Sequence, residues 1–572
     1  MILVGCMYIF IFRGTDYDCR ENIFFDGALP ESKRETRLCR LEKVRLKHEL
    51  FCTRYNNNLK AQRCCMKKCY TIEPDKVLLA RSLPARYKDI PENPFMVSTV
   101  FEDLKCRWNR RNITREANTA LCSCLESLQE YPWADVTFMV PGEADAACSC
   151  VSREKGSAIL SNDSDLLLHE LGPHGCVLFL DSVGMYKGNC NRPADAGIKA
   201  LRLRPADLVH RLGITDIRYF AYELNRTPQA SFPGLVHRSR GAPEKRIIAP
   251  DYLTFMKEYQ SALHTCRNDS HSTEHLPQYF DARVSELFLQ CKYGDVFRLD
   301  GILHMYLTII NDDHARRCAW EAGLSYRELA YSIINTIRPA TDRFSFVHEY
   351  VRRGQRIAID KIALFDEDMV FKGMQALSGR LIQARAMIED DYTSPRYWRM
   401  FALSEIYCRQ INRAGFPGLQ QLVRFLRLGH AGEALDWTDV HLLAQMQAVL
   451  YSLRILGQLL RASAYEETIS EVKRMLSGLP PLYVLMKSRN EIAEEFVNEA
   501  GTTDLVATFF RFCERRCRAK ALRPDEATGA GLQQETNTLE APPQEEVQKC
   551  LCSNMSAERK CSGNIYEVLG FS

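Results

Sequence analysis

Two short acidic stretches decide the fold: Pro141-Gly142-Glu143-Ala144-Asp145-Ala146-Ala147 and Ser161-Asn162-Asp163-Ser164-Asp165-Leu166-Leu167-Leu168. The apolar run 136–140 precedes the first stretch and predicts a buried strand. Residues 144–153 have an apolar helical face and stop before Gly156, so a helix is expected there, and residues 157–160 predict the next strand. Each strand of this βαβ unit therefore ends in a pair of carboxylates.

The four carboxylates of Glu143, Asp145, Asp163 and Asp165 are expected at one edge of a sheet, because sites in open parallel sheets lie at the carboxyl ends of strands. A divalent cation would relieve their repulsion, and hard oxygen ligands suit one or two Mg²⁺ or Mn²⁺ ions. The alternative is that they are solvated loop residues, with Asp163 and Asp165 capping a helix that starts at Leu166. Two pairs on consecutive strand ends favour the metal site.

Residues 31–50 predict a helix dense in charge. Lys33, Arg37 and Arg40 share one face of it, because residues three, four or seven apart do. Such a face could hold a scissile phosphate or follow a nucleic-acid backbone. A solvated charged helix explains the same residues equally well. The basic residues proposed to bind nucleic acid are Lys33, Arg34, Arg37, Arg40, Lys43 and Lys47.

The composition is that of an ordinary globular protein, with 46% hydrophobic and 26% charged residues among 572. The net charge of +3 carries no global signal for nucleic acid, so a binding patch would have to be local. The 23 cysteines are odd in number and scattered through predicted helices and strands, which favours reduced thiols in an intracellular protein. A zinc site built from Cys52, Cys64, Cys65 and Cys69 lacks the usual spacing.

The ends of the chain differ from its middle. Residues 1–20 begin with an apolar leader that is too short to span a bilayer, so no membrane association is expected. Residues 245–520 carry apolar residues at helical spacing and predict a largely α-helical domain. Residues 521–572 predict a disordered tail, and its short apolar motif at 564–569 could dock a protein partner, as could the helical half.

The segments 140–146 and 160–167 resemble the internal nuclease region of the flap endonuclease/XPG family, and the PGEAD and DSDLL signatures are most similar to its Asteroid branch, including fungal members. The resemblance covers residues 20–235 well. It implies an α/β, PIN-like domain over 21–235: a twisted, mostly parallel sheet flanked by helices, with a basic arch-like segment at 31–70 and the acidic core at 136–180. The helical domain and the tail would follow it.

The resemblance also implies an activity and its residues. It implies a Mg²⁺- or Mn²⁺-dependent nuclease that acts on DNA or RNA, structured or single-stranded, with a nuclear role in DNA repair. Asp26-Gly27 ends a strand predicted at 22–25 and resembles the second acidic strand end of the family, so Asp26 becomes a fifth metal ligand. Lys33 and Arg40 match by position the basic residues that contact the reacting phosphate.

Two departures from the family keep a second function open. The first acidic strand end is missing, which suggests a truncated or altered N-terminus, and the glycine-rich hairpin that binds duplex DNA is not recognisable. Asp216 is the remaining candidate for a late metal ligand. The alternative function is therefore a catalytically inactive, PIN-like, Asteroid-type scaffold that binds nucleic acid or protein.

Overall fold

The structure is a computed structural model, and it describes part of the chain. The apolar leader, the arch-like segment beyond residue 58 and the tail lie outside the described residues. The described residues are 22–58, 91–109, 111, 130, 133–186, 197–240, 250–256, 259, 276–293, 300–410, 422, 425–426, 437–463, 470–485, 487, 507, 509, 511 and 513–514.

The predicted βαβ unit is present. Strand β2 (Thr137–Val140) leads into helix α8 (Ala144–Lys155), which ends at Gly156 in the left-handed conformation, and strand β3 (Ala158–Ser161) follows. Strand β1 (Ile23–Asp26) runs parallel to β2, with Asp26 opposite Val140. The strands and the helix expected around the acidic stretches are thus confirmed to within one or two residues.

The expected single, mostly parallel sheet is not what the described strands form. β1 and β2 pair only with each other, whereas β3 runs parallel to β4 (Cys176–Phe179), which pairs antiparallel with β7 (Arg202–Leu203). A further antiparallel pair joins β5 (Gly184–Tyr186) to β6 (Gly197–Lys199). The Gln278 side chain pairs with β2 as a strand would: its Oε1 accepts from Met139 N at 3.1 Å and its Nε2 donates to Met139 O at 3.3 Å. That edge of β2 is therefore closed to β3.

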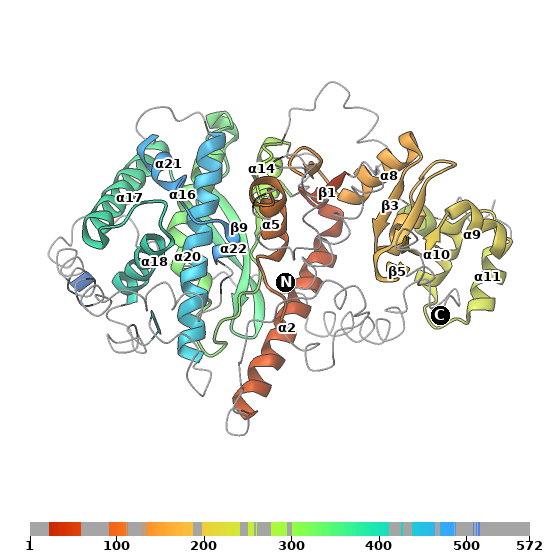
Figure 1. Cartoon of the computed structure of the whole chain (residues 1–572), viewed down its shortest axis with the longest axis horizontal. Coiled ribbons are helices and arrows are strands. Elements are labelled where there is room, and N and C mark those ends of the chain that lie inside the picture. The colour runs from red at the N-terminus through yellow and green to blue at the C-terminus, as the bar shows by residue number, and fades with distance from the viewer. Residues whose placement is uncertain are drawn as a thin grey trace, which may run out of the picture.

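Three helices cover the β3–β4–β7 sheet: α9 (Pro205–Leu212), α10 (Ile217–Arg226) and α11 (Phe232–Arg240). Their apolar faces meet the sheet in a core that contains Ile159, Leu167, Val177, Phe220 and Leu235. Figure 1 shows this unit on the right, with α8 leading into it from the centre of the molecule.

The second half contains a sheet that the helical prediction missed. β8 (Leu303–Tyr306) runs parallel to β9 (Phe346–Arg353), which pairs antiparallel with β10 (Arg356–Ala363). A two-residue connection that begins with Gly354, at φ +61°, closes the β9–β10 hairpin, a conformation that suits glycine. The surrounding helices are α14 (Ala282–Lys292), α16 (Leu324–Asn335), α17 (Glu367–Ile388), α18 (Pro395–Gln410), α20 (Trp437–Ala462), α21 (Ser470–Leu476) and α22 (Leu482–Leu485).

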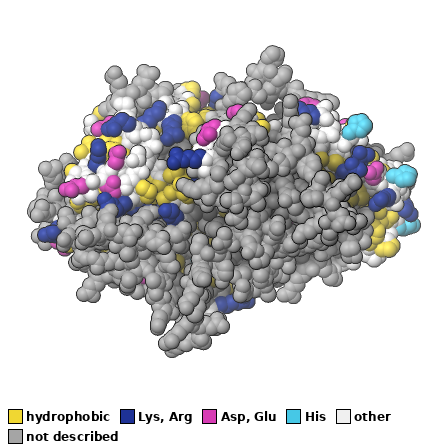
Figure 2. Space-filling model, in the orientation of Figure 1, with side chains coloured by type: hydrophobic (Ala, Val, Ile, Leu, Met, Phe, Trp, Pro, Cys, Tyr) yellow, Lys and Arg dark blue, Asp and Glu magenta, His cyan; other side chains and the backbone are white. Residues whose placement is uncertain are grey.

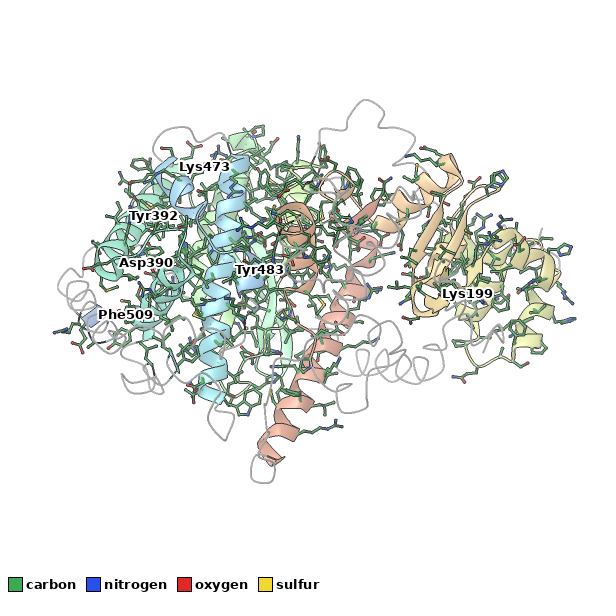
Figure 3. The ribbon with its side chains drawn as sticks, in the orientation of Figure 1. Lys199, Asp390, Tyr392, Lys473, Tyr483 and Phe509 are labelled. Atoms are coloured by element: carbon green, nitrogen blue, oxygen red, sulfur yellow. The ribbon has the colours of Figure 1, made fainter. Side chains whose placement is uncertain are left out.

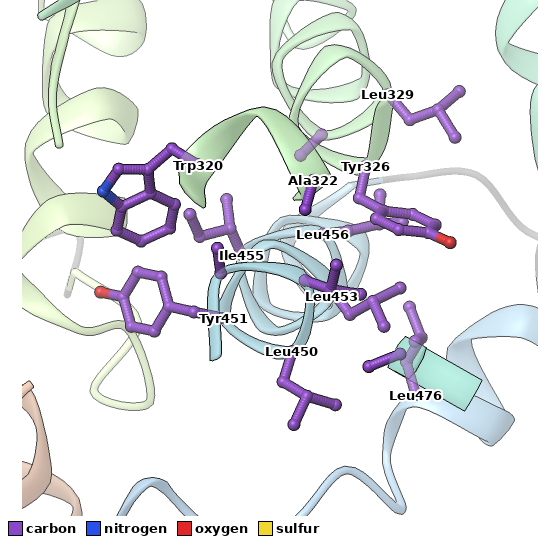
Figure 4. Close-up of a cluster of buried hydrophobic side chains, with 14 of the residues drawn as sticks. Trp320, Ala322, Tyr326, Leu329, Leu450, Tyr451, Leu453, Ile455, Leu456 and Leu476 are labelled. Atoms are coloured by element: carbon purple, nitrogen blue, oxygen red, sulfur yellow. The ribbon is translucent and has the colours of Figure 1, made fainter. Parts of the chain in front are cut away.

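Helix α20 is the centre of this half. It packs against the 3₁₀ helix η7 (Ala319–Gly323), α16 and α21, and Figure 4 shows Trp320 beside Tyr451 and Tyr326 beside Leu456. The rings of Trp320 and Tyr451 meet edge to face at 5.8 Å. Nearby, the buried Arg327 of α16 and the buried Glu349 of β9 form an ion pair at 2.6 Å. None of the described helices is both long and apolar enough to cross a bilayer.

The N-terminal segments pack with the second half rather than with the β3–β4–β7 unit. Ala28, Phe101 and Met139 belong to the large core formed by residues 276–513. Helix α5 (Met96–Glu102) is followed by a π-helical turn whose Arg107 lies 3.8 Å above the ring of Tyr483, labelled in Figure 3. The segments before residue 140 therefore share a hydrophobic core with the second half, whereas the expected domain boundary near residue 240 would separate them. The long helix α2 (Arg34–Asn58) crosses the centre of the molecule (Figure 1).

Candidate active site

The site is built where β1 and β2 end together. Gly27 N donates to Gly142 O at 3.0 Å, so the two chains stay paired beyond their strands. A Cβ on Gly27 would lie 1.9 Å from the carbonyl oxygen of Val140, so only glycine fits there. This close approach places Asp26 beside the first turn of α8, and its Oδ1 accepts from Ala144 N at 2.7 Å. Asp26 thus caps α8 from a neighbouring strand.

Asp145 is the electrostatic centre of the site. It lies in the first turn of α8, and its pKa is raised to about 7 by burial, then by the negative charges of Asp163, Asp26 and Glu143, while Lys33 opposes the shift. Four of the five predicted ligands therefore act on one another electrostatically. The N-terminus of α8 faces this negative charge and partly compensates it.

Lys33 is the cation that the structure places in this cluster. Its Nζ lies 2.6 Å from Glu143 Oε1, and both side chains are partly buried. Lys33 ends the 3₁₀ turn η1 (Glu31–Lys33), directly before α2. The basic segment and the acidic core, 110 residues apart in sequence, therefore meet here.

The second acidic stretch performs the capping role that was the alternative to metal binding. Asp163 Oδ1 accepts from Asp165 N at 2.9 Å and starts the 3₁₀ helix η4 (Ser164–Leu168), two residues earlier than the predicted helix start. Both aspartates are exposed. Within the described chain, the second carboxylate oxygen of Asp163 accepts no hydrogen bond, so capping leaves it available to a cation.

The donor set fits a hard divalent cation in its chemistry. Among the described residues, two groups of three side chains bring their ligand atoms within 4.8 Å of one another, and neither includes Asp26, Glu143, Asp145, Asp163 or Asp165. The carboxylates thus lie in one region without three of their oxygens approaching within 4.8 Å of one another, which is consistent with their mutual repulsion. Burial and the neighbouring acids raise the pKa of Asp145 although Lys33 opposes them, and a Mg²⁺ or Mn²⁺ ion would favour its ionised form.

Two residues near the site were not anticipated from the sequence. His169 follows η4, and burial and then Lys33 lower its pKa to about 4, so its ring is neutral at physiological pH. Asp181 follows β4 and exchanges two hydrogen bonds of 2.9 Å with Asn162, next to Asp163. The signals available were a histidine directly after three leucines and an acid at the end of the apolar run 176–180.

The basic residues divide into two groups. Arg34 pairs with Glu31 and Asp300 at 2.8 and 2.9 Å, and Arg37 pairs with Glu286, with its guanidinium 4.5 Å from the centre of the Tyr306 ring. These two arginines were expected to bind nucleic acid, but the structure ties them to the second half.

The other basic residues of α2 are more accessible. Arg40 is exposed and forms no ion pair within the described chain, and Lys47 lies 3.9 Å from the exposed Glu92. Lys43 is half-buried. On the face shown in Figure 2, Lys and Arg side chains are interspersed with Asp and Glu, in keeping with the small net charge. A nucleic-acid contact would therefore centre on Lys33 and Arg40.

Asp216, the candidate for a late ligand, has a structural role. It caps α10 by accepting from Arg218 N at 2.9 Å, and its Oδ1 and Oδ2 accept from Nε and Nη2 of the Arg218 side chain at 2.9 and 2.5 Å. A bidentate arginine pair occupies both carboxylate oxygens. The structure therefore does not bring Asp216 to the site as a ligand.

Comparison with known proteins supports the family resemblance over the middle of the chain. Residues 92–364 match the model of a family described as XPG domain containing. The match includes Glu143, Asp145, Asp163 and Asp165, continues through β8–β10, and leaves Asp26, Lys33 and Arg40 outside it. No curated protein and no solved structure matches the chain. The region that carries the acidic core is thus similar to XPG domains, and its mixture of helices and strands fits an α/β fold.

Proposed function

We propose that this protein is a metal-dependent nuclease that hydrolyses phosphodiester bonds in DNA or RNA. The observation that supports it is the cluster of Asp26, Glu143, Asp145 and Asp163, in which burial and then the charges of the neighbouring acids raise the pKa of Asp145 to about 7. These residues, with Asp165, would hold one or two Mg²⁺ or Mn²⁺ ions. The XPG-domain match over the same acidic stretches supports the reaction class.

The bound ion would supply a Lewis acid for the phosphate and a water of lowered pKa. The side chains of the chain itself bind and orient. Lys33 can exchange its Glu143 partner for a phosphate oxygen and thereby stabilise the charge that develops there. His169, neutral because its pKa is about 4, adds a hydrogen-bonding group beside Lys33 and Asp163 without adding charge. Arg40, exposed on α2, would follow the nucleic-acid backbone.

A scaffold without catalysis is the second candidate function. It is favoured by the capping role of Asp163, by the ion pair between Lys33 and Glu143, and by the separation of the carboxylates. Such a protein would bind nucleic acid through the same basic residues without cutting it. It would also need no divalent cation for binding.

The deciding experiment is cleavage of labelled single-stranded, flap and hairpin DNA and RNA, with Mg²⁺ or Mn²⁺ and with chelator. The wild type is compared with Asp145→Asn and Asp163→Ala, and the matched control is Asp207→Asn, an exposed acid in the first turn of α9. A nuclease loses cleavage in both site variants and in chelator, but keeps it in the control. Binding without cleavage by the folded wild type, unchanged by the site variants, would establish the scaffold.

A nuclear role in DNA repair is part of the same proposal. It is supported by the resemblance to the flap endonuclease/XPG family and by the basic residues between 33 and 47. A protein partner bound through the helical half or the 564–569 motif remains a prediction. Imaging of the tagged full chain tests the location, and exclusion from the nucleus would contradict it.

A further inference from the structure

Helix α2 buries a polar face, which is unusual for a helix packed against a protein core. Among its residues 34–54, whose exposure the structure describes, the buried ones are Arg45, His48 and Cys52, with 4%, 0% and 6% of their surface exposed. Their spacing of three and four places them on one side of the helix. Glu42 and Glu49 satisfy Arg45 through bonds of 2.8 and 2.7 Å. His48 and Cys52 have no such charged partners, so their burial needs another explanation.

A second histidine reaches the same place from the second half. His314 belongs to the loop between β8 and η7, and its ring nitrogen Nε2 contacts Nδ1 of His48, with ring centres 4.5 Å apart. Ligand atoms of His48, Cys52 and His314 all lie within 4.8 Å of one another. Within the described chain, His314 Nδ1 is buried and has no hydrogen-bond partner.

We propose that His48, Cys52 and His314 bind one Zn²⁺ ion, which joins α2 to the loop 311–318 of the second half. The sulfur of Cys52 lies 3.8 Å from His48 Nε2, the ring nitrogen opposite the one that contacts His314, so His48 would bind the ion through Nε2. Tetrahedral zinc with its usual bond lengths separates a nitrogen and a sulfur ligand by about 3.6 Å. Two imidazoles and a thiolate select a borderline cation over Mg²⁺ or Ca²⁺. The fourth position would be taken by solvent.

The surrounding charges are compatible with this ion. Burial lowers the pKa of His48 to about 3 and of His314 to about 4, so both rings are neutral and keep a lone pair for the metal. Two cations act on these histidines: Arg352, which Asp312 neutralises at 2.7 Å with both side chains 1% exposed, and Arg45, which Glu42 and Glu49 neutralise. Asp313 adds a further negative charge near Cys52. Zinc would therefore meet a site that is not positively charged.

Binding must expel one proton. Burial, with Asp312 and Asp313, raises the pKa of Cys52 to about 12, so the free site holds a thiol. Zn²⁺ would replace that proton, forming a zinc–thiolate bond and releasing one H⁺ to solvent. This proposal is independent of the nuclease: its donors are nitrogen and sulfur, whereas those of the acidic site are carboxylate oxygens.

The test uses the reduced, chelator-treated full-length protein and Co²⁺ as a probe for Zn²⁺. A thiolate-to-Co²⁺ charge-transfer band should grow to one equivalent and disappear when Zn²⁺ is added. Cys52→Ser should abolish the band, and His314→Gln should weaken Co²⁺ affinity by more than about tenfold, the loss seen even for outer-shell changes at zinc sites. Zn²⁺ should raise the melting temperature of the wild type and not that of Cys52→Ser.

Matched controls separate this site from others in the chain. Cys39→Ser, on the same helix, and His237→Gln, exposed on α11, should keep the band. Asp163→Ala should keep it as well, which distinguishes binding here from binding at the acidic site. A wild type without the band, or a band that survives in folded Cys52→Ser, overturns the proposal. If Cys52→Ser does not fold, a band of unchanged affinity in His314→Gln, a half-buried loop residue, overturns it equally.

Discussion

Lys33 and Glu143 are 110 residues apart in sequence, yet Lys33 Nζ lies 2.6 Å from Glu143 Oε1. This ion pair joins the start of the basic helix to the acidic strand ends. It also provides the positive charge that limits the rise in the pKa of Asp145. The pair therefore couples the region expected to hold phosphate to the region expected to hold metal.

The first prediction concerns Lys33. Lys33→Met should reduce cleavage by roughly 10²- to 10³-fold, the usual cost of removing one group that stabilises transition-state charge. The loss should appear in kcat more than in KM. Lys155 is an exposed lysine at the C-terminal end of α8, and Lys155→Met should leave both kcat and KM unchanged. Equal losses in the two variants would mean that general charge, rather than position, is responsible.

The second prediction concerns Asp145 and pH. Its folded pKa, about 7, lies above its ordinary value of 3.8, so the folded state binds more protons between these values. The stability that this proton confers is complete below about pH 3.8 and is lost as pH rises through about 7. In chelator, Asp145→Asn should therefore melt at a higher temperature than the wild type near pH 8, and the difference should shrink as the pH is lowered.

Divalent cation should reverse that difference. Mg²⁺ or Mn²⁺ binds the ionised carboxylate, so it should stabilise the wild type near pH 8 and not Asp145→Asn. Thermal melting with and without the ion measures both effects. If Mg²⁺ and Mn²⁺ leave the wild-type melting temperature unchanged, the acidic cluster is not a metal site.

The third prediction concerns Gly27. Gly27→Ala would place a Cβ 1.9 Å from the Val140 carbonyl oxygen, so β1 and β2 must separate. The free energy of unfolding should fall by about 1–3 kcal/mol, as for other overpacked sites. Gly142→Ala is the control, because nothing lies within 4 Å of its Cβ. Chemical denaturation should show the control unchanged or slightly more stable.

The fourth prediction separates the two kinds of arginine on α2. Arg37→Ala breaks the pair with Glu286 and should lower the melting temperature, whereas exposed Arg40→Ala should not. Arg40→Ala should instead weaken nucleic-acid binding. It should also reduce the slope of log K against log[salt] by about the amount that one phosphate contact contributes. Binding titrations at several salt concentrations measure this. An unchanged slope would remove Arg40 from the nucleic-acid surface.

The fifth prediction concerns the buried pair of Arg327 and Glu349. Within the described chain, Arg327→Met leaves the buried Glu349 carboxylate with the hydroxyl of Tyr331, at 2.6 Å, as its remaining partner. Removing one member of such a pair costs about 3–5 kcal/mol. The side chain of Arg317 is 73% exposed and lies 3.7 Å from Glu321. Arg317→Met should therefore change the free energy of unfolding by less than about 0.5 kcal/mol. Similar losses in both would contradict the burial argument.

Local sequence predicted local structure well. The strands ending at Asp26 and Val140, and the helix that Gly156 terminates, follow from apolar runs and stop signals a few residues away. The placement of the acids at 143–145 and 163–165 just past two strand ends also follows from these boundaries. What could not be predicted was which strands share a sheet. The edge of β2 is instead bound by Gln278, 139 residues from Met139.

The partners of charged residues could not be predicted from the sequence either. Nothing near Arg37 in the sequence indicates that it pairs with Glu286. From the sequence alone, an arginine bound to the second half therefore cannot be distinguished from one that is free to bind phosphate. The sheet β8–β10 was missed because its strands lie between strongly helical segments, and β8 is buried along its whole length. The site shared by His48, Cys52 and His314 combines residues separated by more than 260 positions, beyond any spacing rule.

The position of β1, β2 and α5 in the core of the second half has a consequence for synthesis on the ribosome. Phe101 and Met139 complete their packing only against residues from 276 onward. At ordinary translation rates, the first strand would wait on the order of tens of seconds for its partners. A fragment ending near residue 256 would expose these apolar faces permanently. We therefore expect such a fragment to depend on chaperones or to aggregate.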